Sequence, residues 1–142
     1  MPNEWALCGD RARCLGHPEV GSGRRDGTGH AAANRLLERW QQGELNLLVP
    51  PLWLFEVGNI LCLKRPADAF AALAALWDLG LSEVPFSRGL IQRTLTLAQS
   101  HGLTFYDASY LAVAEEKKVV LVTADGKFYR RLPAGLPVEL LE

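Results

Sequence analysis

Residues 119–125 read Val119-Val120-Leu121-Val122-Thr123-Ala124-Asp125. The first four residues favour β-structure and no polar residue interrupts them, which predicts a strand buried on both faces. In a parallel α/β sheet, ligands bind beyond the carboxyl ends of the strands. Thr123 and Asp125 therefore lie where such a fold usually has its ligand-binding or active site. The alternative role of Asp125 is to cap the short helix expected over residues 127–131.

Helices and strands are expected to alternate from residue 31 onward. Apolar runs predict strands over residues 45–49, 81–86, 119–122 and 138–141. Apolar periodicity and capping residues predict helices over residues 31–42, 50–64, 67–79, 88–100, 107–117 and 127–131. This alternation is typical of a mostly parallel sheet that helices cover on both faces.

The first 30 residues differ in composition from the rest of the chain. They hold six of the 13 glycines and two of the three cysteines. They show neither a two-residue nor a 3.6-residue apolar period, and residues 16–29 are not expected to form a helix or a strand. We therefore divide the chain into an atypical glycine- and arginine-rich segment, residues 1–30, and a domain over residues 31–142.

Charge and cysteine content restrict the class of protein. The chain has 142 residues, and its 15 Lys and Arg against 16 Asp and Glu give a formal charge of −1. A sequence-independent nucleic-acid binder usually carries a basic excess, so nucleic acid would need a local basic patch or a metal ion. Three irregularly spaced cysteines argue against a disulfide framework, and we expect a reduced, cytoplasmic protein. The longest apolar stretch, residues 45–63, is interrupted by prolines and polar residues and is not expected to span a membrane.

Two further carboxylates stand in unusual places. Glu56 lies in the middle of an apolar helix, where it shares a face with Asn59. A carboxylate there needs a cation or a path to the surface, and an ion pair with an arginine or a solvated rim position is the alternative to a site. Asp107 begins the helix expected over residues 107–117, where a cap or a partner for the helix dipole is the structural alternative.

Glu56, Asp107 and Asp125 together predict a cation site. Converging carboxylates repel one another unless a hard divalent cation neutralises them, and Mg²⁺ and Mn²⁺ prefer oxygen ligands. Other chemistries find less support. The sequence holds neither a G-x-x-x-x-G-K-[ST] nor a G-x-G-x-x-G motif. Its three histidines are scattered, which does not favour a Ser or Cys triad.

Three stretches resemble the PIN-domain family of the VapC toxin type: PPLWLFEVGNIL at 50–61, YDASYLA at 106–112 and LVTAD at 121–125. The likeness covers residues 31–142, in the order and spacing that the family shows. It implies a three-layer α/β/α sandwich and a ribonuclease that depends on Mg²⁺ or Mn²⁺. By this resemblance Glu56, Asp107 and Asp125 match the second, third and fourth acids of the family site, and Thr123 supports the last acid.

The same resemblance implies partners. An RNA substrate, a VapB-type antitoxin with a small DNA-binding domain, and a second copy of the chain in a homodimer are expected. The sequence departs from the family at its start, where an apolar strand normally ends in the first acid. Residues 5–13 correspond to that strand, with Asp10 as the nearest acid. Their context predicts a first strand that is atypical or missing, and an activity impaired by the altered N-terminus.

Two other functions stay open from the sequence. The first is a catalytically inactive PIN-like module that binds an antitoxin or itself. The helix over residues 67–79 would offer it an apolar face with Phe70, Leu73, Leu76 and Trp77, although core packing is the more ordinary role of such a stripe. The second is a different α/β metal-dependent phosphatase or nuclease that uses the same three acids.

Overall fold

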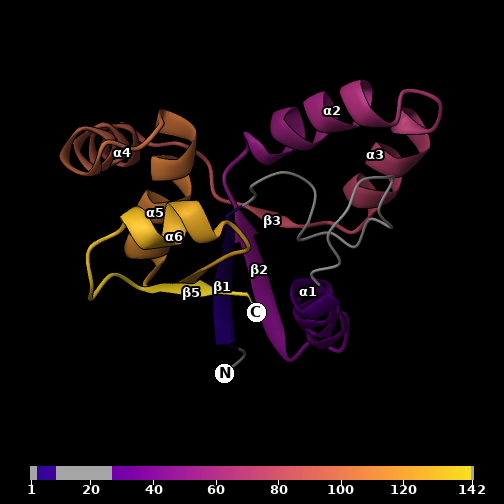
Figure 1. Ribbon diagram of the computed structural model, residues 1–142, viewed down its shortest axis with the longest axis horizontal. Helices are drawn as coiled ribbons and strands as arrows, with labels where there is room; N and C mark the ends of the chain where they lie inside the picture. The colour runs from indigo at the N-terminus through magenta and orange to yellow at the C-terminus, as the bar shows by residue number, and fades with distance from the viewer. Residues whose placement is uncertain (1–2, 9–26, 142) are drawn as a thin grey trace.

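Helices and strands alternate through residues 3–8 and 27–141, the part of the chain that the computed structural model describes (Figure 1). The elements follow in the order β1 (Asn3–Cys8), α1 (Gly27–Gln41), β2 (Leu45–Val49), α2 (Trp53–Lys64), α3 (Ala69–Asp78), β3 (Ser82–Glu83), α4 (Arg88–His101), α5 (Phe105–Lys117), β4 (Val120–Thr123), α6 (Gly126–Arg131) and β5 (Val138–Leu140).

A five-stranded sheet in the order β3-β2-β1-β4-β5 forms the centre of the fold. All four pairings are parallel, which confirms the expected sheet. Strand β1 lies in the middle, where Trp5 pairs with Leu47 of β2 on one side and with Val120 of β4 on the other. The prediction that the first strand is missing is therefore wrong. The side chains of β1 lie outside the described part, so its atypical character stays a prediction.

Two apolar clusters fill the two faces of the sheet. Leu121 of β4 is buried in a cluster with α4, α5 and the Phe128 side chain of α6. The next residue, Val122, faces the other cluster, which contains β2 and residues from α1 and α2. Successive side chains of a strand point to opposite faces, so this alternation separates the helices into two layers. Figure 1 shows α4 and α5 on one side of the sheet and α1 on the other, a three-layer α/β/α sandwich.

Several elements begin or end at residues other than those predicted. Helix α1 begins at Gly27 rather than at residue 31, so the prediction that residues 27–29 are not helical is wrong. Pro50 lies in a turn before α2, where its carbonyl accepts a hydrogen bond from the Trp53 amide. Strand β3 contains only Ser82 and Glu83, because Pro85 follows and cannot donate to a neighbouring strand.

No residue of helix α3 is fully buried, although Leu76 packs against the cluster that contains β2, as core packing predicts. Phe70 is 86% exposed and Trp77 is 59% exposed, so core packing is the wrong interpretation for these two side chains. Phe55 and Leu63 of α2 are also exposed. Figure 1 shows that α2 and α3 lie beside each other, away from the centre of the sheet. The fold therefore presents large apolar side chains on both helices.

Some expectations concern residues outside the described part. Residues 9–26 are not described, so Asp10 is not placed and the division of the chain at residue 30 stays a prediction. In the described ranges, every helix is too short or too polar to cross a membrane.

Candidate active site

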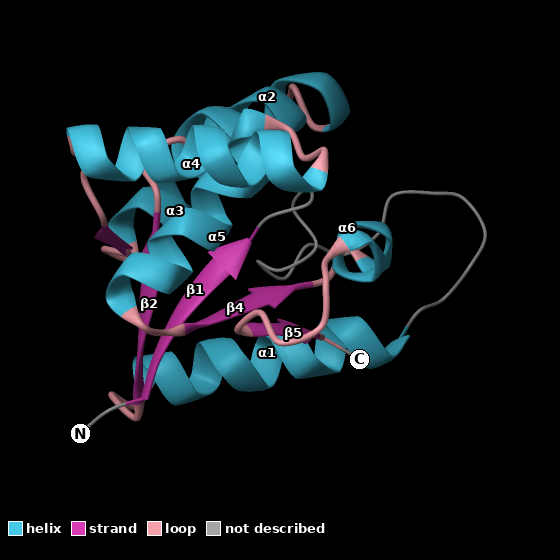
Figure 2. Ribbon diagram, turned by 90° about the vertical axis from the view of Figure 1, so that its left-hand side faces the viewer, coloured by secondary structure: helices cyan, strands magenta, loops and turns pink. Residues whose placement is uncertain are grey.

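Thr123 ends β4 at the carboxyl edge of the sheet, and Asp125 follows two residues later. Figure 2 shows β1 and β4 side by side, with α6 following the end of β4. Thr123 is fully buried, and its Oγ1 accepts a hydrogen bond of 3.0 Å from the Asp125 amide. The Oδ1 atom of Asp125 accepts hydrogen bonds from the backbone amides of Lys127 at 2.8 Å and Phe128 at 3.1 Å. Asp125 is therefore the N-terminal cap of α6, as its alternative role predicts, and these bonds fix the orientation of its carboxylate.

Asp107 lies in the first turn of α5. The N-terminal cap of that helix is Thr104, whose Oγ1 accepts a hydrogen bond of 3.0 Å from the Asp107 amide. The interpretation of Asp107 as the cap is therefore wrong, whereas its position in the first turn suits a partner for the helix dipole. Over the described ranges, no hydrogen bond or ion pair engages the Asp107 carboxylate.

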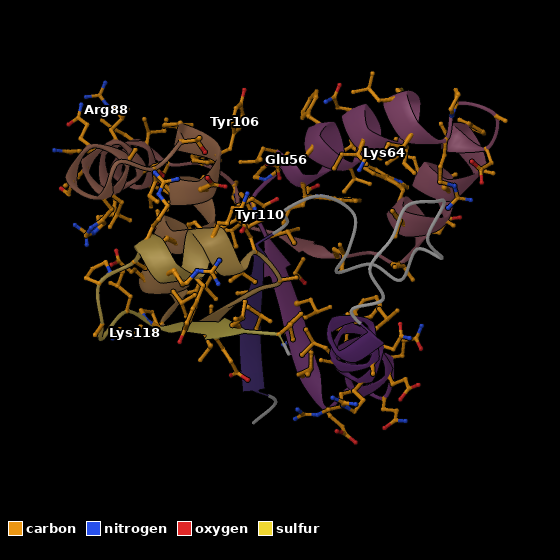
Figure 3. The ribbon with its side chains drawn as sticks, viewed as in Figure 1. Glu56, Lys64, Arg88, Tyr106, Tyr110 and Lys118 are labelled. Atoms are coloured by element: carbon orange, nitrogen blue, oxygen red, sulfur yellow. The ribbon has the colours of Figure 1, made fainter. Side chains whose placement is uncertain are left out.

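Glu56 of α2 lies against α5. Its Oε2 atom accepts a hydrogen bond of 2.6 Å from the hydroxyl of Tyr110, which is 54 residues away in the sequence. Figure 3 shows the two labelled side chains next to each other near the upper ends of β1 and β2. Because residues three apart share a face of a helix, Tyr110 and Asp107 lie on the same side of α5. Glu56 is thereby held at the face of α5 that carries Asp107.

The chemistry of these donors suits a hard divalent cation. Three carboxylates, two of them oriented by hydrogen bonds from the protein, are the oxygen ligands that Mg²⁺ and Mn²⁺ prefer. Among the described side chains, those of residues 31–141, no group of three or more Asp, Glu, His or Cys residues is close enough to hold one metal ion. The structure thus brings Glu56 to α5, the helix that carries Asp107. Asp125 lies separately, after the end of β4, where it caps α6.

Tyr110 and Thr104 are residues of this region that the sequence did not single out. Tyr110 is a large residue with a hydroxyl, in a helix whose other buried residues are small or apolar. A buried tyrosine usually finds a hydrogen-bond partner for its hydroxyl. A tyrosine in such a helix therefore indicates that a polar side chain lies opposite it. Thr104 immediately precedes the observed start of α5, and Thr104 with Asp107 three residues later forms the [ST]-x-x-[DE] pattern of a helix start, whereas the predicted helix begins only at residue 107.

Comparison with known proteins identifies the family. The sequence model of the PIN domain matches residues 25–131. The chain belongs to the PIN domain family. A curated relative of this PIN-domain chain is Exonuclease VapC9 from Pyrobaculum aerophilum, which is 32% identical over 107 residues, 73% of this chain and 80% of the relative.

Solved PIN-domain structures share the fold. VapBC2 from Rickettsia felis, bound to a DNA fragment from its promoter, matches with a TM-score of 0.66 and 16% identity, over 98% of this chain and 99% of that chain. VapC20 from Mycobacterium tuberculosis, described as a toxin that cleaves the sarcin–ricin loop, matches with a TM-score of 0.64 and 20% identity, over 93% and 95% of the two chains. At these identities the likeness shows the common architecture.

Proposed function

We propose that this PIN-domain protein is a metal-dependent endoribonuclease and the toxin of a VapBC-type toxin–antitoxin pair. The observation that carries the proposal is the hydrogen bond that holds Glu56 at the face of α5 where Asp107 lies. The curated relative is named an exonuclease, which supports phosphodiester cleavage. The similar fold of a toxin described as cleaving the sarcin–ricin loop supports RNA as the class of substrate.

Glu56, Asp107 and Asp125 are the residues proposed to hold Mg²⁺ or Mn²⁺. Mg²⁺ usually keeps several waters and binds through one or two carboxylates together with substrate phosphates, so a closed cage of three acids is not required. When bound, the cation would offset negative charge on the phosphate and activate the attacking water. The buried Thr123 would support the site indirectly, by holding the Asp125 amide.

The acids have different proposed roles. Asp107 and Asp125 would bind the cation directly or through water. Glu56 would either join them or accept the proton of the attacking water. The hydrogen bonds to Asp125 Oδ1 restrain that carboxylate before any ligand arrives, which lowers the entropy lost on binding.

The proposal is tested by cleavage of single-stranded RNA in Mn²⁺ by the full chain and by Asp107→Asn and Asp125→Asn. Wild-type cleavage that stops in EDTA and is lost in both variants would support the proposal. Undiminished cleavage in both variants would remove these acids from the mechanism. Hydrolysis of small phosphomonoesters with intact RNA would favour a phosphatase instead.

The position of the cut needs its own experiment, because the curated relative is named an exonuclease. A circular RNA has no end from which an exonuclease can start. The proposed endoribonuclease should linearise it in Mn²⁺, whereas degradation of only the linear form of the same RNA would indicate an exonuclease.

A second candidate function rests on the exposed apolar side chains of α2 and α3. Large exposed apolar areas often mark protein-binding surfaces, and Phe70 and Trp77 contribute such area here. In the toxin this surface would contact the antitoxin or a second copy of the chain. In an inactive module this contact would be the whole function. Tight binding of the antitoxin by a chain that cleaves no RNA in Mn²⁺ would favour the module.

A further inference from the structure

The hydrogen bond between Tyr110 and Glu56 joins two helices of different layers at the candidate site. We propose that Tyr110 is a positioning residue, whose hydroxyl fixes the Glu56 carboxylate in the orientation that a divalent cation requires. The inference rests on the proposed function, since it assigns to Tyr110 a role in preparing that same site.

The geometry of the bond suits an ionised acceptor. The 2.6 Å between the Tyr110 hydroxyl and Glu56 Oε2 lies at the short end of the O–H···O range, where hydrogen bonds to carboxylates are found. A glutamate side chain has three rotatable bonds, and a short bond to one oxygen restricts the direction of the other. The hydroxyl thus restricts how the carboxylate is presented.

The tyrosine itself is firmly held. Its side chain is 3% exposed and belongs to the apolar cluster between the sheet, α4 and α5. The ring is therefore packed on all sides and cannot carry the hydroxyl to solvent. A donor that is fixed in this way holds its acceptor more strictly than a mobile surface side chain does.

One helix consequently sets the positions of two acids. Asp107 is attached to α5 directly, and Glu56 is attached to it through Tyr110, three residues further along. The position of Glu56 relative to Asp107 then depends on α5 rather than on α2 alone. Hydrogen-bond partners that orient metal ligands typically change metal affinity by 10–100-fold when they are removed.

The test is the affinity of the full chain for Mn²⁺, measured by isothermal titration calorimetry without RNA. Tyr110→Phe removes the hydroxyl and keeps the packed ring, and we expect the dissociation constant for Mn²⁺ to rise by about 10-fold or more. The matched control is Tyr129→Phe on α6, whose hydroxyl makes no hydrogen bond within the described ranges, and it should bind Mn²⁺ as the wild type does.

A double variant shows whether Tyr110 acts through Glu56. If it does, Tyr110→Phe should weaken Mn²⁺ binding little further in a Glu56→Gln background. Equal affinity of Tyr110→Phe and wild type, with only a loss of stability to urea in EDTA, would show a merely structural role and overturn the inference. So would a full additional loss in the Glu56→Gln background. A wild type that binds no Mn²⁺ would instead overturn the proposed function, and this inference with it.

Discussion

At the scale of single residues, Asp125 combines two tasks that substitution can separate. Its Oδ1 atom caps α6 through the amides of Lys127 and Phe128, and the carboxylate is also a proposed metal ligand. Asparagine caps a helix about as well as aspartate, whereas alanine does not. The cap needs only an oxygen at that position, but a cation needs the negative charge.

Asp125→Asn should therefore leave the free energy of unfolding within about 0.5 kcal/mol of wild type and reduce RNA cleavage by at least about 10-fold. Asp125→Ala should lower the free energy of unfolding by about 1 kcal/mol, because the cap is lost. Urea unfolding in EDTA and single-turnover cleavage in Mn²⁺ measure the two effects. Full activity in Asp125→Asn would contradict the role of Asp125 as a metal ligand and would support only its role as the helix cap.

At the scale of elements, local sequence predicted the strands that are mostly apolar. Strand β2 has the predicted bounds, and β4 is displaced by one residue. Strand β1 could not be predicted in this way, because it includes Asn3 and Glu4 and owes its place to pairing with β2 and β4 on both sides. Pairing partners that are distant in sequence decide such a strand, and a local window does not contain them.

The same reason limits prediction of the site. Glu56 and Asp107 stood out because a carboxylate in an apolar helix and one near a helix start are unusual. The bond from Tyr110 to Glu56 spans 54 residues and depends on how α2 and α5 are placed, which no local pattern reports. The cap at Asp125 was predictable because Asp125 contacts amides only two and three residues away.

The start of α5 gives a prediction that concerns one element. Thr104→Ala removes the oxygen that accepts a hydrogen bond from the Asp107 amide. We expect the free energy of unfolding to fall by about 1 kcal/mol. Urea unfolding in EDTA measures this loss. Thr104→Ser keeps the oxygen and serves as the control, which should retain most of the stability. A Thr104→Ala protein as stable as wild type would contradict the role of Thr104 as the cap.

Helix α3 gives a second prediction. Because Phe70 is 86% exposed and Trp77 is 59% exposed, each single change to serine should alter the free energy of unfolding by less than about 0.5 kcal/mol. The double variant should lose capture of the VapB-type antitoxin proposed as the partner, measured by co-purification. Ala75→Ser, another exposed position of α3, is the control and should retain it. Unchanged capture by the double variant would exclude α3 from the partner surface.

At the scale of the whole molecule, a ligand that binds only the folded protein stabilises it by mass action. Mn²⁺ at about 100 times its dissociation constant should raise the free energy of unfolding by about 2.7 kcal/mol. This stabilisation is measured as a melting temperature that is higher in Mn²⁺ than in EDTA. Asp107→Asn should respond much less. K⁺ at matched ionic strength controls for screening, and an equal response to K⁺ and Mn²⁺ would argue against a specific site.

The parallel sheet brings the carboxyl ends of β1, β2 and β4 to one edge, and this arrangement underlies the proposal for the three acids. The most direct test is an anomalous difference map from a crystal soaked in MnCl₂. We predict a peak about 2–2.5 Å from carboxylate oxygens of Glu56 or Asp107, with Asp125 bound directly or through one water. A fully soaked crystal whose anomalous peaks all lie away from these three side chains would contradict the account.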